Sequence, residues 1–100
     1  MAVVLFGEAG GADEHAYRDW LDAHADGRVV NLRREPDPAY AVLHRATCWT
    51  IGFATRREDT GPYTGRAYVK ACAAEEHDLL AWVRWRQGAG FSKRCRHCGA

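Results

Sequence analysis

The pattern that most constrains this chain lies near its C-terminal end, where Cys95 and Cys98 are separated by two residues. Two cysteines at this spacing can present both sulfurs to one metal ion from a single tight turn. A redox pair usually stands where a strand meets the N-terminus of a helix, whereas this pair follows the last expected helix. The spacing therefore favours half of a zinc site over a redox pair.

The two remaining cysteines are the preferred second half of the site, which gives an all-cysteine ligand set of Cys48, Cys72, Cys95 and Cys98. If the expected strands 39–45, 49–53 and 66–72 form a meander, the first and third run parallel. Cys48 and Cys72 then lie near the same end of the sheet. Residues 88–94 are long enough, when extended, to return the terminal pair to that end after a helix.

The alternative ligand set replaces Cys72 with His44, which has three residues between it and Cys48. Cys72 would then be an ordinary buried cysteine of the core. His97 is a weaker candidate because the turn between the terminal cysteines points it outward. Either set fills all four positions of a tetrahedral ion, so the sequence predicts a structural Zn²⁺ and not a catalytic one.

The chain has 100 residues, enough for one domain with a small core that benefits from a metal. No basic residue precedes the short apolar run at residues 1–6, which argues against a signal peptide. We therefore expect a cytoplasmic protein, where thiols stay reduced and clustered cysteines more often bind metal than form disulfides.

Hydrophobic periodicity and turn residues predict a single small zinc-stapled α+β domain. It would contain a helix, an antiparallel sheet of three or four strands, a second helix and a C-terminal zinc knuckle. Three tryptophans on or beside the helix stripes, Trp20, Trp82 and Trp85, are expected in the core. The expected elements are a short strand at 3–6, helices at 12–25 and 74–87, and strands at 28–32, 39–45, 48–53 and 66–72, with a hairpin between the second and third strands and a polar loop at 56–65.

Charge is distributed unevenly along the chain, although the formal net charge is only +1. Residues 1–27 carry six acidic side chains and one basic side chain, whereas residues 79–100 carry five basic side chains and none that are acidic. Arginine and lysine suit phosphates, and tyrosine faces suit bases. The sequence thus predicts a nucleic-acid surface made of Arg33, Arg34, His44, Arg45, Arg66, Lys70, Lys93, Arg94 and Arg96.

Three segments carry a resemblance to known proteins: residues 43–48 (LHRATC), residues 68–72 (YVKAC), and Trp82 followed by Cys95 and Cys98. They resemble small zinc-bearing modules associated with bacterial restriction and other DNA-targeting proteins. The resemblance covers about half of the chain and includes no nuclease signature. It implies that the partner is DNA.

Catalysis is not expected, because a closed zinc site has no open position and no His-Glu-x-x-His helix is present. The leading interpretation is a non-catalytic, zinc-stabilised nucleic-acid-binding module. One alternative is a protein-interaction or adaptor module, or an accessory domain of a larger enzyme. The other is a small thiol-redox enzyme.

Overall fold

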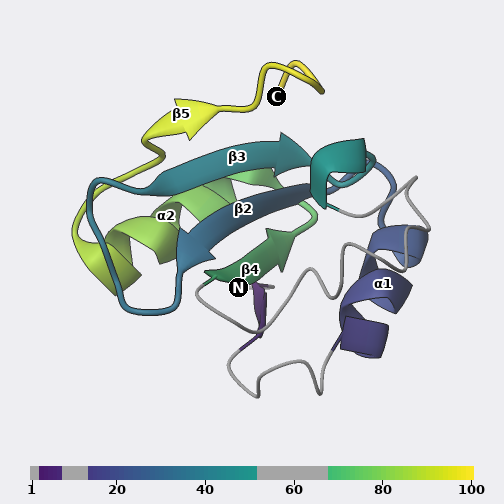
Figure 1. The fold of residues 1–100 in the computed structure, drawn as a ribbon, viewed down its shortest axis with the longest axis horizontal. Helices are drawn as coiled ribbons and strands as arrows, with labels where there is room; N and C mark the ends of the chain where they lie inside the picture. The colour runs from purple at the N-terminus through teal and green to yellow at the C-terminus, as the bar shows by residue number, and fades with distance from the viewer. Residues whose placement is uncertain (1–2, 8–13, 52–67) are drawn as a thin grey trace.

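In its described residues the protein is a small α+β domain in which two α-helices accompany a mixed five-stranded sheet (Figure 1). The computed structural model describes residues 3–7, 14–51 and 68–100. The sheet has the strand order β1-β4-β2-β3-β5. The elements are β1 (Val4–Phe6), α1 (Glu14–Ala23), β2 (Arg28–Arg33), β3 (Ala41–Arg45), the 3-10 helix η2 (Trp49–Ile51), β4 (Tyr68–Ala73), α2 (Glu76–Gln87) and β5 (Lys93–Arg94).

The expected hairpin is confirmed: β2 and β3 are antiparallel, with Val30 opposite Leu43. The connecting segment contains Pro36 and Pro38, which lack the N–H group that a ladder requires. In that turn the side chain of Asp37 accepts a hydrogen bond from the N–H of Ala39. The chain therefore reverses direction where its composition predicted.

The expected strand at 48–53 is wrong in its described part, because Trp49–Ile51 forms a 3-10 turn. Two successive turns connect it to β3: Cys48 N–H donates to Arg45 O at the end of β3, and Ile51 N–H donates to Cys48 O. Cys48, at the start of this turn, is buried in the same cluster as Cys95. The last two residues of that predicted strand and the predicted loop 56–65 lie outside the described residues.

The meander is also wrong. β4 pairs with β2 on one side and β1 on the other, so β2 separates β4 from β3. β3 and β4 do run parallel, as expected, because each is antiparallel to β2. The short strand β5 adds parallel to the free edge of β3 and makes the sheet mixed. The chain order had suggested no strand there.

Helix α1 presents the predicted stripe to the core, where Tyr17 and Leu21 are buried and Trp20 is partly buried. The chain leaves the helix through Gly27. A Cβ at this position would lie 2.7 Å from the Trp20 ring and 3.1 Å from Ala73 O. Glycine is therefore required here by the close approach of the Trp20 ring and β4. The predicted cap, Asp13, lies outside the described residues.

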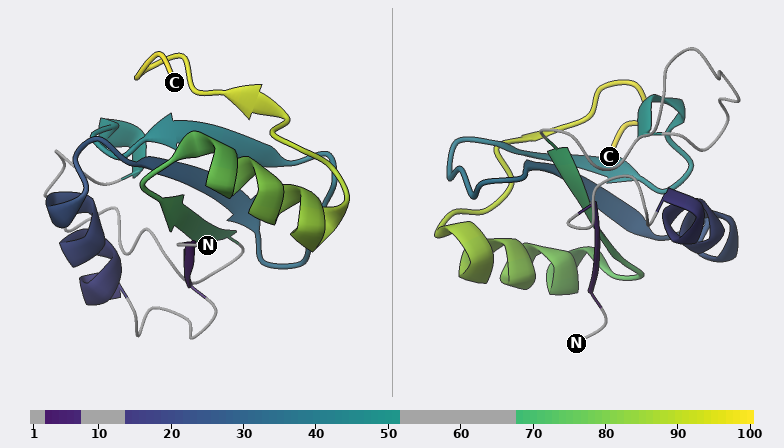
Figure 2. Two further views of the ribbon diagram at one scale, coloured as in Figure 1. Left: turned by 180° about the vertical axis from the view of Figure 1, so that it is seen from behind. Right: turned by 60° about the horizontal axis from the view of Figure 1, so that its bottom comes forward.

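Helix α2 lies along one face of the sheet (Figure 2), and the buried side chains of α1 belong to the cluster on the other face. Leu79 and Val83 are buried beneath it, and its acidic first turn and basic last turn follow the helix dipole. Gly88 ends the helix with φ +77° and donates its N–H to Arg84 O. Trp85 does not enter the core as predicted: it points away from the sheet and is 79% exposed.

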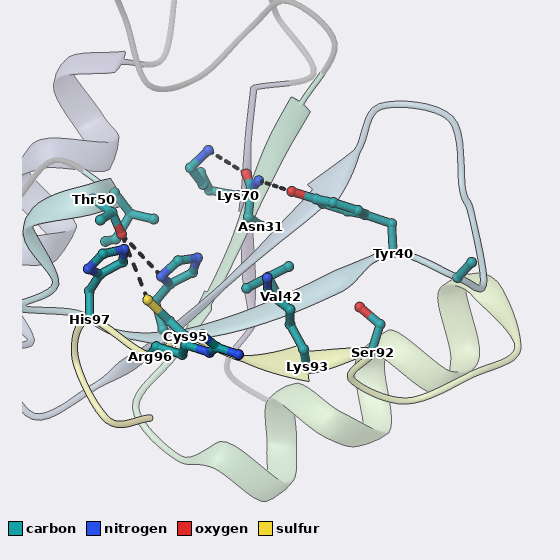
Figure 3. Close-up of a pocket in the computed structure, with 13 residues that line it drawn as sticks. Asn31, Tyr40, Val42, Thr50, Lys70, Ser92, Lys93, Cys95, Arg96 and His97 are labelled. Carbon is teal, nitrogen blue, oxygen red and sulfur yellow. Dashed lines mark hydrogen bonds between the residues drawn. The ribbon is translucent and has the colours of Figure 1, made fainter.

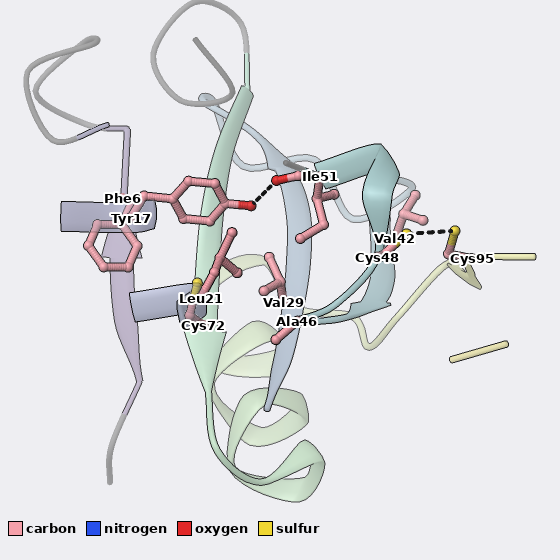
Figure 4. Packing of buried hydrophobic residues seen from close by; sticks show 10 residues of the cluster. All are labelled: Phe6, Tyr17, Leu21, Val29, Val42, Ala46, Cys48, Ile51, Cys72 and Cys95. Carbon is pink, nitrogen blue, oxygen red and sulfur yellow. Dashed lines mark hydrogen bonds between the residues drawn. The ribbon is translucent and has the colours of Figure 1, made fainter. Parts of the chain in front are cut away.

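The two faces of the sheet carry separate side-chain clusters, because successive residues of a strand point to opposite sides. The cluster on the α2 side is entirely apolar and includes Leu32, Leu43 and Val69. The cluster on the other side includes Tyr17, Leu21 and three of the four cysteines (Figure 4). Among the described residues, neither helix is long and apolar enough to cross a membrane.

Candidate metal centre

Four side chains from two distant parts of the chain, residues 44–48 and 95–98, meet at one end of β3. Each of them offers one ligand atom, and these four atoms all lie within 4.8 Å of one another. The residues are His44, Cys48, Cys95 and Cys98. All of the cysteines are thiols, with no disulfide among them. This compact group is able to hold a metal ion.

The spacing of the sulfurs fits tetrahedral coordination. Two thiolates bound to one ion at about 2.3 Å stand about 3.8 Å apart along a tetrahedral edge. Cys48 Sγ and Cys95 Sγ are 3.8 Å apart (Figure 4). Three soft thiolates and one imidazole form a donor set of the kind that binds zinc in closed structural sites. The residues therefore fit the predicted ion.

Neighbouring groups support the sulfurs. The backbone N–H of Arg45 donates to Cys98 Sγ at 3.3 Å, and Thr50 Oγ1 lies 2.8 Å from Cys48 Sγ. Thr50 Oγ1 also lies 3.4 Å from His44 Nδ1 (Figure 3). Hydrogen bonds from such outer groups stabilise thiolates and orient ligands. The sequence had given no signal for Thr50, because its role depends on the η2 turn.

The protonation of His44 suits a ligand. Burial lowers its pKa to about 4, and the positive charges of Lys70, His97 and Lys93 add to the effect. The imidazole is therefore neutral at physiological pH and keeps a nitrogen lone pair for a metal.

The thiols differ from one another. Burial raises the pKa of Cys48 to about 11, although the bonds from Thr50 oppose this effect. Burial also acts to raise the pKa of Cys95, but N–H groups of Cys98 and His97 outweigh it and leave that pKa lowered. Of these two, Cys95 is the thiol that ionises more readily before a metal binds.

The terminal pair is brought to the sheet by the β5 edge. The N–H groups of Ser92 and Cys95 donate to Ala41 O and Leu43 O, each at 2.8 Å. Ser92 Oγ adds two bonds to the backbone of Ala41, as donor and as acceptor. The tail thus follows β3 residue by residue until its cysteines reach Cys48.

Cys72, the preferred fourth ligand in the sequence analysis, is not part of the group. It lies in the middle of the sheet opposite Val29, and Val29 in turn lies opposite His44. Two strand spacings, about 9.5 Å, therefore separate the backbones of Cys72 and His44. Cys72 is fully buried in the cluster that contains Leu21, and burial raises its thiol pKa. The alternative set, with His44, is the one that the fold brings together.

The predicted nucleic-acid residues are not gathered in one place. Arg33, Arg45, Lys93 and Arg96 are exposed, Arg34 is half-buried, and Arg66 lies outside the described residues. Three of the predicted residues are not free surface groups. His44 belongs to the cysteine group, Lys70 is only 5% exposed, and Arg94 forms a two-pronged ion pair with Glu76.

Two tyrosines lie beside the exposed Arg33, on the same face of the sheet as the cysteine and histidine group but away from it. Tyr40 and Tyr68 pack with ring centroids 5.7 Å apart. The guanidinium of Arg33 lies 4.8 Å from the centre of the Tyr40 ring and 5.7 Å from that of Tyr68. Arg33 also pairs with Asp37 at 3.3 Å. Basic and aromatic side chains of the kind expected to bind nucleic acid thus lie together in one local cluster of Arg33, Tyr40 and Tyr68.

Comparisons with family models, curated proteins and solved structures found no match to this chain.

Proposed function

We propose that this protein is a non-catalytic nucleic-acid-binding module whose fold is fastened by a structural zinc ion. His44, Cys48, Cys95 and Cys98 would hold the zinc, and their four ligand atoms leave no open position for a substrate. The metal joins the basic tail to the end of β3. It would therefore hold the basic side chains of the tail in place beside the sheet.

The observation that carries the nucleic-acid proposal is the Arg33–Tyr40–Tyr68 cluster on the sheet face. Bases stack on tyrosine faces, and arginine contributes both stacking and phosphate contacts. Lys93 and Arg96 continue the positive charge along the β5 edge. An aromatic platform beside a basic edge suits unpaired bases, so we propose single-stranded nucleic acid, with DNA as the expected form.

Fluorescence anisotropy with a labelled single-stranded DNA, the matching RNA and a duplex, at low salt, tests this proposal. Single strands should bind, and the affinity should fall steeply as salt rises because binding releases counterions. The double variant Arg33→Gln/Tyr68→Ser should weaken binding at least about tenfold, since one stacked base contributes about 1–3 kcal/mol.

Arg84→Gln is the matched control for charge, because Arg84 is exposed on α2 at the opposite face. It should bind like the parent chain. If none of the three nucleic acids binds the zinc-loaded protein, or if both variants behave alike, the proposal is wrong.

A protein-interaction function is the second candidate. The exposed indole of Trp85 beside Trp82 on α2 favours it, since large aromatic side chains are common in interfaces. A protein partner that stays bound after nuclease treatment and is lost with Trp85→Ser would support this candidate.

A further inference from the structure

A pocket of about 620 Å³ lies between the sheet and the C-terminal tail, beside the metal centre (Figure 3). Its volume is typical of sites that bind small organic molecules. β2, β3 and β4 form its floor, and β5 with the residues that follow forms one wall. The nucleic-acid proposal does not account for this cavity.

The most unusual group in the pocket is Lys70, a lysine that is almost fully buried in the middle of the sheet. Its ammonium donates to Asn31 Oδ1 at 2.5 Å, and Asn31 Nδ2 donates to Tyr40 Oη at 3.1 Å. An ammonium has three N–H donors. Within the described part of the chain, the bond to Asn31 is the only one that the Lys70 ammonium makes, so two of its N–H donors remain available.

A buried ammonium normally needs a carboxylate partner, because removing its charge from water is costly. The described residues that line the pocket include Lys70, Lys93 and Arg96 but no aspartate or glutamate. Glu14 acts on Lys70 through its charge, but it is itself paired with Arg18 at 3.0 Å. A divalent ion with three thiolates carries one negative charge and offsets only part of the cationic lining.

The remaining lining is suited to an aromatic ring. Val42 and Ile51 provide apolar surface, and the ring of Tyr40 lines the pocket at the end away from the cysteines. In Figure 3 the row of Lys70, Asn31 and Tyr40 forms one side, with Lys93 on the side that β5 contributes. A ligand in this space would meet positive charge and an aromatic face at once.

We propose that this pocket binds a small phosphorylated ligand with an aromatic ring, of the mononucleotide class. Lys70 and Lys93 would contact the phosphate, and the ring would pack against Tyr40 and Val42. The pocket shares Tyr40, Lys93 and Arg96 with the surface proposed for nucleic acid, but neither Arg33 nor Tyr68 lines it, so this small-molecule site goes beyond nucleic-acid binding.

Isothermal titration calorimetry of the zinc-loaded chain with AMP, adenosine and inorganic phosphate tests the proposal. AMP should bind one per chain. Adenosine, which lacks the phosphate, and inorganic phosphate, which lacks the ring, should each bind at least tenfold more weakly. Lys70→Met and Lys93→Gln should each weaken AMP binding about tenfold, while Arg84→Gln, on the opposite face of the sheet, should leave it unchanged.

The inference would be overturned by no binding of AMP up to about 10 mM, or by AMP affinity that is the same in both lysine variants as in the parent. Phosphate that binds as tightly as AMP would also overturn it, because the ring would then contribute nothing. Because Lys93 is exposed, Lys93→Gln remains informative if Lys70→Met alters the fold. Arg33→Gln/Tyr68→Ser should retain AMP binding, so failure of the nucleic-acid proposal is seen separately.

Discussion

The two faces of the sheet are built by different means. On the α2 face, apolar side chains such as Leu32, Val69 and Leu79 are fully buried between helix and strands. On the other face, a cysteine and histidine group, a buried lysine and a pocket lie within the same layer. The α2 face is held by apolar packing, whereas the other face carries a group able to hold a metal ion and a buried lysine, with no aspartate or glutamate among the described residues that line its pocket. We therefore expect the α2 face to contribute stability through apolar packing, and the other face to contribute both the stability of the proposed zinc and the proposed binding sites.

The largest expected effect comes from removing the metal. Structural zinc contributes on the order of 10 kcal/mol to the folding of small zinc domains. A strong chelator should therefore lower the free energy of unfolding by several kcal/mol. Hydrogen exchange should show β5 and the tail opening before α2, since the α2 face has no metal ligand. Equal and simultaneous loss of protection on both faces would contradict the comparison.

A matched pair of variants checks the ligand set in the same experiment. His44→Ala should abolish the binding of one zinc per chain in native mass spectrometry, whereas Cys72→Ala should retain it. Cys72→Ala should cost only about 1 kcal/mol, as expected for a small buried truncation. The reverse outcome would restore the all-cysteine set.

The next largest effect is expected on the apolar face. Leu79 is fully buried under α2, and truncation to alanine removes its contacts and leaves a cavity. Leu79→Ala should lower the free energy of unfolding by about 3 kcal/mol, measured by urea titration of the zinc-loaded protein. Zinc stoichiometry should not change. Loss of zinc together with stability would mean that the two faces are not independent.

A smaller effect of opposite sign is expected from Lys70. Burial, its largest influence, lowers the pKa of Lys70 from 10.5 to about 8. Below pH 8 the lysine is charged both folded and unfolded, and the folded protein carries the full cost of burial. Between pH 8 and 10.5 the unfolded chain binds more protons than the folded one, so stability should rise with pH.

Lys70→Met should consequently stabilise the protein by about 2 kcal/mol at pH 7, with some of the gain lost because Asn31 Oδ1 gives up its donor. The stabilisation should shrink as pH rises through that window. Urea titrations at pH 7 and pH 10 measure both effects. A destabilised variant at pH 7 would mean that the lysine has a structural partner.

The smallest effect is expected at Trp85, which is exposed on the outer side of α2. Trp85→Ser should change the free energy of unfolding by less than about 0.5 kcal/mol, because it removes few buried contacts. Thermal unfolding by circular dichroism is sufficient to measure this. A loss of more than about 2 kcal/mol would place the indole in the core, as periodicity had suggested.

The sequence predicted turns and helix ends well where a single proline or glycine decides the local structure. The hairpin follows from its two prolines, and the end of α2 follows from Gly88. Cys95 and Cys98 were identified as half of a metal site by their spacing alone. The strand expected at 48–53 failed because a short apolar run is compatible with either a strand or a turn. Helix periodicity likewise could not tell that Trp85 would face solvent.

The sequence by itself determined two helices, a β-hairpin, a pair of ligands with fixed spacing and a basic C-terminal tail, because each depends on residues close together in the chain. Only the tertiary structure decided that β2 lies between β3 and β4, and this placement excludes Cys72 and selects His44. The pocket around Lys70 is likewise a product of the fold. It forms because β5 pairs with β3 although Val42 and Lys93 are 51 positions apart in the chain, a choice that no local pattern encodes.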